Sequence, residues 1–276
     1  MNMRLAQATL ILGLAFAAGT AQAATNLVTN GNFDNLTNGY GQVVVNPDGT
    51  NRTSGTYTSS ANGWYSYYTA DNKNSGSTAG YPFIFYTNNA SAGFGDAWDN
   101  GQRYLWTSSN GGTSTWDGTS QSAGGVTGGG NYVVMDGGYH TTALSQNIAG
   151  LVSGTTYTLS FLWAAAQWSD GSGGFATGDT TESVKVSIDG KNYTTDTVNL
   201  PSKGFSGWMA KSLTFTYGGG SNVLSFLATG TPAGLPPMTL LDSVSLSAVP
   251  EPGTLTLAGL AVAATLVTLR RRRKAA

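Results

Sequence analysis

The chain contains no cysteine, one histidine and only two glutamates among its 276 residues. The missing cysteine excludes disulfides, thiolate metal ligands and a cysteine nucleophile. His140 has no second histidine with which to share a metal, and no G-x-S-x-G motif occurs, so a Ser-His-Asp site is not indicated. A glycosidase needs two carboxylates across a cleft, and Glu182 is the only glutamate before the C-terminal tail. We therefore predict no catalytic residues; the alternative is a hydrolase or lyase that acts on polysaccharide.

Positive charge is also scarce outside the two ends of the chain. The formal net charge is −1, but Arg4 and a basic cluster at the C-terminus supply much of the positive charge. Without the ends, the body keeps seven basic and thirteen acidic side chains. A body of this sign has no basic groove for a polyanion, so we predict that nucleic acid is not a partner.

No segment between the two ends repeats its apolar residues at a helical period. Residues 156–161 and 184–188 alternate apolar and polar side chains, and Asp189-Gly190 is a two-residue hairpin signal. The chain is rich in glycine, serine, threonine and asparagine, which favour turns and strands over helix. We predict an all-β sandwich, with most strands after residue 131 and long Gly-, Asn- and aromatic-rich loops between residues 46 and 130.

The N-terminus has the three parts of an export signal. Arg4 precedes an apolar run that ends near Ala18, and Ala21-Gln22-Ala23 matches the small-x-small cleavage rule. We predict that residues 1–23 are a signal peptide cleaved after Ala23 and that residues 24–248 form the body. The alternative is an uncleaved N-terminal anchor.

The C-terminus combines a proline motif, an apolar run and a block of positive charge. Residues 254–269 are uncharged and would span about 24 Å as a helix, which is the short end of what a bilayer needs. We predict a single transmembrane helix here. By the positive-inside rule, the following residues form a cytoplasmic stop: Arg270, Arg271, Arg272, Arg273 and Lys274. The proline motif before the helix consists of Val249, Pro250, Glu251 and Pro252.

This order of parts at residues 249–276 resembles the PEP-CTERM sorting signal of Gram-negative bacteria. The resemblance implies export across the inner membrane, transient anchoring in it, and cleavage near Pro250-Glu251-Pro252 by an exosortase. It further implies delivery of the body to the cell surface or to an exopolysaccharide matrix. The alternative is an ordinary tail anchor.

Three stretches of the body resemble the galactose-binding-like jelly rolls that serve as carbohydrate-binding modules. They are "NLVTNGNFD" at the start, Gly63-Trp64, and "LLDSVSL" at the end. The resemblance implies a jelly-roll β-sandwich whose first and last segments lie together. It also implies a structural calcium ion, for which Asp34 and Asp242 are the carried-over ligands. The alternative is that Asp34 caps a turn and Asp242 lies on a solvated strand end.

Aromatic residues concentrate in the irregular part of the body. Asp96, Asp99 and Asp117 lie near several of them, which is a mixture that a sugar site uses. The possible glycan contacts are Trp98, Tyr104, Trp106 and Trp116. The leading hypothesis is a non-catalytic surface or matrix protein that binds exopolysaccharide through these rings. The alternatives are a structural matrix protein without a discrete site, in which the rings pack a long insertion, and the polysaccharide-active enzyme named above.

Overall fold

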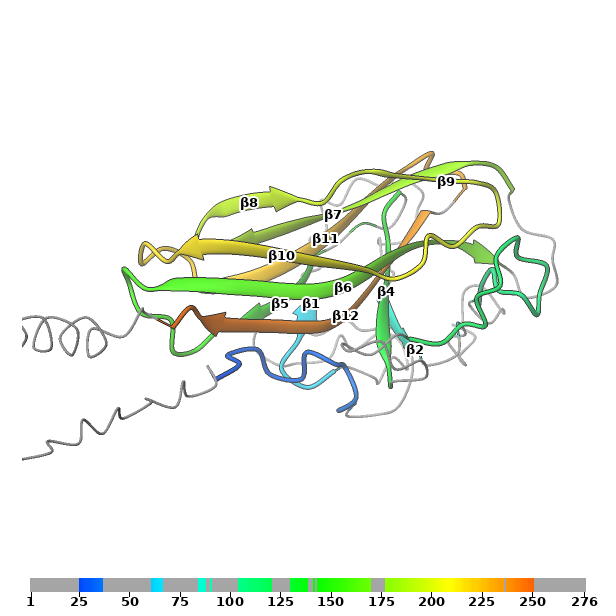
Figure 1. The fold of residues 1–276 in the computed structure, drawn as a ribbon. Coiled ribbons are helices and arrows are strands. Elements are labelled where there is room, and N and C mark those ends of the chain that lie inside the picture. The colour runs from blue at the N-terminus through cyan, green and yellow to red at the C-terminus, as the bar shows by residue number, and fades with distance from the viewer. Residues whose placement is uncertain are drawn as a thin grey trace, which may run out of the picture. The chain divides into compact units, whose positions relative to one another are not determined.

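The computed structural model describes residues 25–36, 61–66, 84–87, 90, 104–120, 130–138, 141, 143–169, 177–235 and 237–250. Thr25–Val249 forms one compact unit (Figure 1). Several predictions lie outside the described residues: the signal peptide with Ala21 and Ala23, the transmembrane helix, Glu251, Pro252, Arg270 to Lys274, and Trp98. Over the ranges given above, no helix has the length and apolar character needed to cross a membrane.

The described strands form two antiparallel sheets. The first sheet has the order β1 (Tyr65–Ser66), β5 (Ala143–Asn147), β11 (Val223–Thr231), β7 (Thr180–Ile188) and β8 (Lys191–Thr194), with β9 (Val198–Leu200) paired to β7. The second has the order β10 (Met209–Thr216), β6 (Thr156–Ser169), β12 (Pro237–Ala248), β4 (Tyr132–Asp136) and β2 (Ile84–Thr87), with β3 (Tyr104–Leu105) paired to β6.

The order of the strands is that of a jelly roll. From β4 to β7, each strand lies in the opposite sheet from the one before it, and the same is true from β10 to β12. The second sheet therefore has β12 between β4 and β6, and the first has β11 between β5 and β7 (Figure 1). This double-sheet arrangement confirms the prediction of an all-β jelly-roll sandwich.

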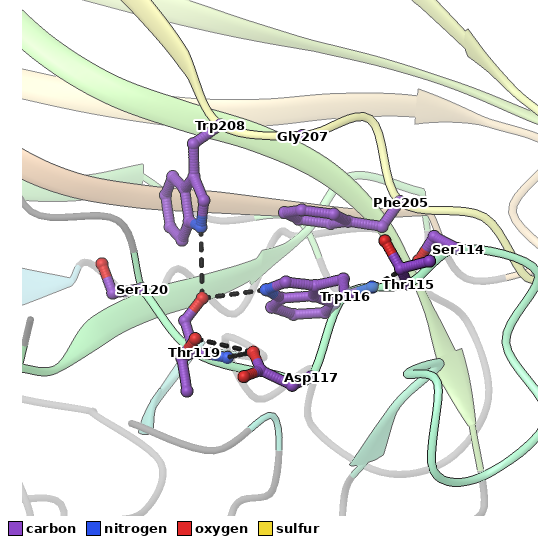
Figure 2. Close-up of a pocket in the computed structure, with 9 residues that line it drawn as sticks. All are labelled: Ser114, Thr115, Trp116, Asp117, Thr119, Ser120, Phe205, Gly207 and Trp208. Atoms are coloured by element: carbon purple, nitrogen blue, oxygen red, sulfur yellow. Dashed lines mark hydrogen bonds between the residues drawn. The ribbon is translucent and has the colours of Figure 1, made fainter. Parts of the chain in front are cut away.

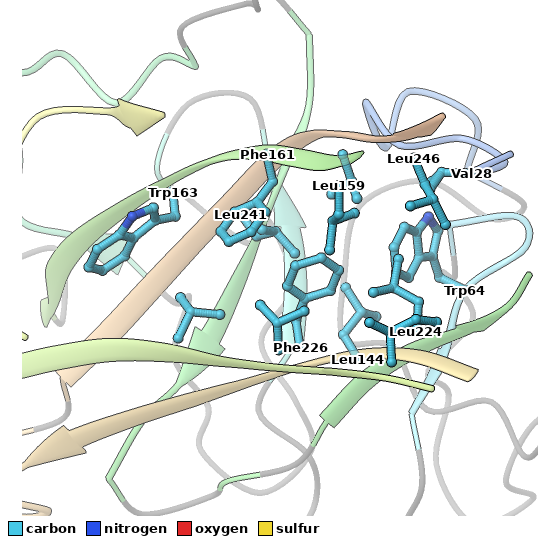
Figure 3. Close-up of a cluster of buried hydrophobic side chains, with 14 of the residues drawn as sticks. Val28, Trp64, Leu144, Leu159, Phe161, Trp163, Leu224, Phe226, Leu241 and Leu246 are labelled. Carbon is cyan, nitrogen blue, oxygen red and sulfur yellow. The ribbon is translucent and has the colours of Figure 1, made fainter. Parts of the chain in front are cut away.

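The core between the sheets follows from the period-two pattern. On β6, Tyr157, Leu159, Phe161 and Trp163 are buried while the residues between them are half-buried. Phe161 meets Phe226 of β11 edge-on, with ring centroids 5.2 Å apart. Figure 3 shows these rings among the aliphatic side chains of both sheets. Phe161 and Trp163 are therefore core residues, as their place on an alternating strand indicates.

The predicted hairpin is confirmed between β7 and β8. Asp189 and Gly190 both have positive φ, 55° and 69°, as a type I′ turn requires. The Asp189 carboxylate accepts hydrogen bonds from Lys191 Nζ and from the backbone N–H groups of Gly218 and Gly220, each at 2.9 Å. These bonds lower the pKa of Asp189, the Gly218 bond contributing most. The turn is thus tied to the loop between β10 and β11.

The two ends of the sandwich are bonded to each other. Leu27 N donates to Leu246 O at 2.7 Å, Leu246 N to Asn26 Oδ1 at 2.9 Å, and Val244 N to Gly31 O at 2.9 Å. The N-terminal segment, residues 25–36, therefore lies along the last strand. At the end of that strand, Val249 N donates to Thr156 O at 2.9 Å. The sheet hydrogen bonds thus reach the first residue of the proline motif.

Candidate functional site

The outer face of the second sheet is partly covered by two loops. Tyr132, Ala164 and Leu240 belong to a second buried cluster, separate from the core between the sheets. Leu105 of β3 and Trp116 of the loop that follows β3 also belong to this cluster. Partly buried Phe205 and Trp208, from the segment before β10, pack against it. The apolar side chains of the sheet thus fix both loops in place.

The two loops line an open pocket of about 480 Å³. Trp116 and Phe205 stack almost parallel, with centroids 4.0 Å apart and an interplanar angle of 10°. Trp208 stands nearly perpendicular to Phe205, at 6.4 Å and 73° (Figure 2). The lining residues are Ser114, Thr115, Trp116, Asp117, Thr119, Ser120, Phe205, Gly207 and Trp208. Aromatic faces and short polar side chains therefore share one concave surface.

Hydrogen bonds hold the aromatic rings of the pocket. The indole N–H groups of Trp116 and Trp208 both donate to the carbonyl of Thr119, at 2.8 and 3.3 Å (Figure 2). Beneath them, the Tyr132 hydroxyl donates to Gly118 O at 2.7 Å. Burial raises the pKa of Tyr132 well above its usual value, so this ring stays neutral. The rings are positioned before any ligand arrives, which lowers the entropy cost of binding.

Asp117 supplies a negative charge at the rim of the pocket. Its Oδ1 accepts hydrogen bonds from the hydroxyl and the backbone N–H of Thr119, at 2.6 and 3.1 Å. These bonds lower the pKa of Asp117, the hydroxyl bond contributing most. The carboxylate is exposed and ionised at neutral pH, so it can accept hydrogen bonds from a ligand's hydroxyl groups.

The structure separates the predicted glycan contacts. Trp116 lines the pocket, whereas Tyr104 is half-buried on β3 and is not among the lining residues. The prediction for Trp106 is wrong, because none of its surface is exposed. Its backbone N–H donates to Gln167 O at 3.1 Å, which draws the ring under the loop, where the Lys203 ammonium lies 4.5 Å from its centroid.

Phe205 and Trp208 were not predicted as site residues. They follow Trp116 by about ninety positions in the chain, and only the fold brings the two segments together. The local signal was the short stretch "GFSGW", in which glycines flank two aromatic residues before a strand.

The two predicted calcium ligands lie behind the pocket. Asp242 is buried and accepts hydrogen bonds from Ser120 Oγ and from Ser243 N. The pKa of Asp242 is raised to about 7, chiefly by burial, with a smaller contribution from the nearby charge of Asp34. Asp34 accepts from Asn131 N at 2.8 Å and from Asn32 Nδ2 at 2.6 Å.

The alternative of a solvated Asp242 is therefore wrong, and the backbone group that Asp34 bonds, Asn131 N, is distant in the sequence. Across the described ranges, no group of three or more acidic or histidine side chains could hold a metal ion. A calcium ion on Asp34 and Asp242 would need most of its six to eight oxygens from elsewhere, so this site stays a prediction.

Comparison with known protein families identifies the tail. The PEP-CTERM protein-sorting motif matches residues 248–273. No curated protein matches the chain.

Solved structures overlap with the body only loosely. The enzymatically active domain of tailspike protein 4 from bacteriophage CBA120 has a TM-score of 0.30 and 12% identity, over 81% of this chain but only 21% of the tailspike. A CBM4 structure has a TM-score of 0.27 and 23% identity, over 55% of this chain and 90% of that one. The N-terminal cellulose-binding domain of Cellulomonas fimi β-1,4-glucanase C has a TM-score of 0.28 and 16% identity, over 48% of this chain and 87% of that one.

The jelly-roll assignment rests on the strand order and pairing described above. The sorting motif implies export and anchoring in the membrane through the C-terminus before processing. The chain is thus a jelly-roll protein that carries a PEP-CTERM sorting motif beginning at Ala248, the final residue of β12.

Proposed function

We propose that the exported body is a non-catalytic carbohydrate-binding protein of the cell surface or extracellular matrix, with exopolysaccharide as its ligand. The observation that carries this proposal is the pocket in which Trp116, Phe205 and Trp208 lie beside Asp117 and Thr119. Its volume of about 480 Å³ lies within the range of about 300–1,000 Å³ that is typical of small-ligand sites.

The chemistry of the pocket matches that of a sugar ring. A pyranose has apolar C–H faces and a rim of hydroxyl groups. An indole ring offers a flat apolar surface for such a face. The Asp117 carboxylate and the Thr119 hydroxyl, joined at 2.6 Å, form a polar pair at the edge of the rings. A ligand that stacks on Trp208 can therefore also donate a hydroxyl proton to Asp117.

The distribution of carboxylates supports binding rather than cleavage. Hydrolysis of a glycosidic bond ordinarily uses two carboxyl groups that flank that bond. Among the described residues that line the pocket, Asp117 is the single carboxylate. Asp242 lies behind Ser120 and is buried, with its oxygens bonded to Ser120 and Ser243.

Sorting would bring this pocket to its ligand. An exosortase-type enzyme would cut near Pro250, after the body has crossed the inner membrane. Among the described residues, Val249 is the last that bonds to the sheet, through its N–H and Thr156 O. A cut after Val249 therefore leaves β12 and the whole sandwich intact for the cell surface or the matrix.

Affinity electrophoresis tests the binding proposal. Wild-type protein should be retarded in gels that contain exopolysaccharide from the producing cells, and Trp208→Ala should lose at least tenfold in affinity. Tyr65→Ala, an aromatic truncation on β1 in the other sheet, should bind like the wild type.

Two results would overturn the proposal. A wild-type protein that binds no glycan would favour a purely structural matrix role. Release of new sugar ends from the polysaccharide, lost in Asp117→Asn, would instead favour a hydrolase or lyase.

A further inference from the structure

Three polar side chains meet in the interior of the sandwich, away from the pocket. Gln167 lies on β6 in the second sheet, and Thr180 and Glu182 lie on β7 in the first. Their exposed fractions are 3%, 2% and 0%. Polar groups buried in this way are nearly always hydrogen-bonded.

Hydrogen bonds align the three side chains in one row. The Thr180 hydroxyl donates to Glu182 Oε1 at 2.5 Å and accepts from Gln167 Nε2 at 2.8 Å. Gln167 Nε2 also donates to Gly178 O at 2.8 Å, and Gln167 Oε1 accepts from the backbone N–H of Lys203 at 2.6 Å. The Lys203 N–H requires an oxygen as its partner, which fixes the orientation of the Gln167 amide.

These groups have the parts of an acyl-transfer site. A hydroxyl whose proton points at a carboxylate is an activated nucleophile. The Gln167 carboxamide is the acyl group, and its carbon is one bond from Nε2, so it lies within about 4 Å of Thr180 Oγ1. The Lys203 N–H already donates a hydrogen bond to Gln167 Oε1, the atom on which negative charge would develop when the hydroxyl attacks the carboxamide carbon.

The backbone at Lys203 is bent in a way that serves this contact. Lys203 has a φ of 62°, a backbone conformation that residues other than glycine rarely adopt. The turn is closed by a hydrogen bond from Gly204 N to Pro201 O at 2.9 Å. Strained positions of this kind concentrate where a backbone group must be aimed at a reacting atom.

We propose that Thr180 and Gln167 react to form an intramolecular ester that joins the two sheets covalently. Thr180 Oγ attacks Gln167 Cδ and passes its proton to the Glu182 carboxylate. The oxyanion on Gln167 Oε1 is held by the Lys203 N–H. Glu182 then returns the proton to Nε2, the Cδ–N bond breaks, and ammonia leaves. One C–O bond forms, one C–N bond breaks, and no oxidant or further reactant is needed.

Glu182 is suited to move this proton. Its pKa is raised to about 8, because burial raises it by more than the Thr180 hydrogen bond lowers it. A proton carrier works best when its pKa lies near the working pH. Within the part of the chain that the structure describes, Glu182 Oε2 has no hydrogen-bond partner. Burial of all three side chains also keeps water from the ester once it has formed.

Such a bond would replace what cysteine supplies in other exported proteins. The chain has no cysteine and therefore no disulfide. The ester would join the end of β6 to the start of β7, and so tie one sheet of the sandwich to the other.

Peptide mass analysis of the full chain, recovered after export, tests the proposal. A protease that cleaves before aspartate separates Gln167, in residues 136–169, from Thr180, in residues 179–188. We expect these two peptides to be recovered joined, and lighter than their sum by one ammonia molecule. Hydroxylamine, which cleaves esters, should separate them.

Four variants distinguish the ester from an unrelated change in mass. Thr180→Val and Glu182→Gln should give two unlinked peptides of unmodified mass, whereas Thr180→Ser should still be linked. Thr181→Val, which alters the neighbouring half-buried threonine, is the matched control and should be linked like the wild type. Separate, unmodified peptides from the folded wild type would overturn the proposal, and so would a link that persists in Thr180→Val.

Discussion

A single methyl group at Gly31 should weaken the closure between the two ends of the sandwich. A Cβ placed on Gly31 would lie 1.9 Å from the carbonyl oxygen of Val244, far inside contact distance. The Gly31 carbonyl accepts the hydrogen bond from Val244 N at 2.9 Å. The substitution Gly31→Ala therefore forces the N-terminal segment away from β12.

The expected loss follows from what holds this segment. Three hydrogen bonds join it to β12, and each contributes about 0.5–1.5 kcal/mol. Val28 is buried in the core, and its exposure would cost about 1.5–3 kcal/mol. Because the segment can shift without leaving entirely, we expect the free energy of unfolding to fall by about 2–4 kcal/mol.

Urea unfolding, followed by tryptophan fluorescence, measures this difference. Gly234→Ala is the matched control, because a Cβ there meets no atom within 4 Å. The control should change stability by less than about 1 kcal/mol. If Gly31→Ala has the same unfolding midpoint as the control, the close approach of residues 31 and 244 is not part of the folded protein.

Three further predictions concern the termini, pH and calcium. The protein recovered outside the cell should end between Val249 and Pro252, as measured by C-terminal peptide mass, and an intact basic tail would contradict sorting. The free energy of unfolding should fall as pH rises from about 5 to 8, because Glu182 has a pKa of about 8 when folded and 4.5 as its ordinary value, so the folded state binds the additional proton. Glu182 should contribute a slope of about 1.4 kcal/mol per pH unit to the free energy of unfolding. Glu182→Gln should reduce the slope and leave a contribution of the same sign from Asp242. Urea unfolding at a series of pH values measures the slope in both proteins, and an equal slope would refute the raised pKa of Glu182. If calcium binds Asp34 and Asp242, a chelator should lower the melting temperature, and an unchanged temperature would reject that site.

The sandwich could be predicted from the sequence because its signals are local. Alternation in residues 156–161 and 184–188 places side chains on two faces of a strand, and Asp189-Gly190 fixes the turn. Each of these patterns depends on residues that are close in the sequence, so it can be recognised without knowledge of the tertiary contacts. The choice of Asp34 and Asp242 brought together two groups that do interact, through the charge of Asp34 on Asp242.

The pocket could be predicted only in part because it is assembled by tertiary contacts. Trp106 and Trp116 lie in similar polar, glycine-rich surroundings and both are buried, but Trp106 is wholly covered near the pairing of β3 with β6, whereas Trp116 keeps 9% of its surface exposed and lines the pocket. Phe205 and Trp208 join Trp116 only because both loops pack on one sheet face. Local composition does not indicate which ring will be covered by which loop.

The same limit explains why the interior polar group was missed. Glu182 looked isolated in the sequence, as the only glutamate before the tail. Thr180 lies two residues before Glu182 on β7, and Gln167 of β6 reaches it across the space between the two sheets. No spacing rule within a strand predicts such a contact.

The most direct test of the proposed function is equilibrium binding of exopolysaccharide to the exported protein, read from tryptophan fluorescence. Trp208 and the largely buried Trp116 both line the pocket, so a sugar stacked on Trp208 should change the tryptophan emission of the protein. We predict saturable binding with a spectral change in the wild type, and at least a tenfold weaker affinity in Trp208→Ala, measured at a temperature at which both proteins are fully folded. Equal affinity in both proteins would contradict the assignment of this pocket as the carbohydrate site.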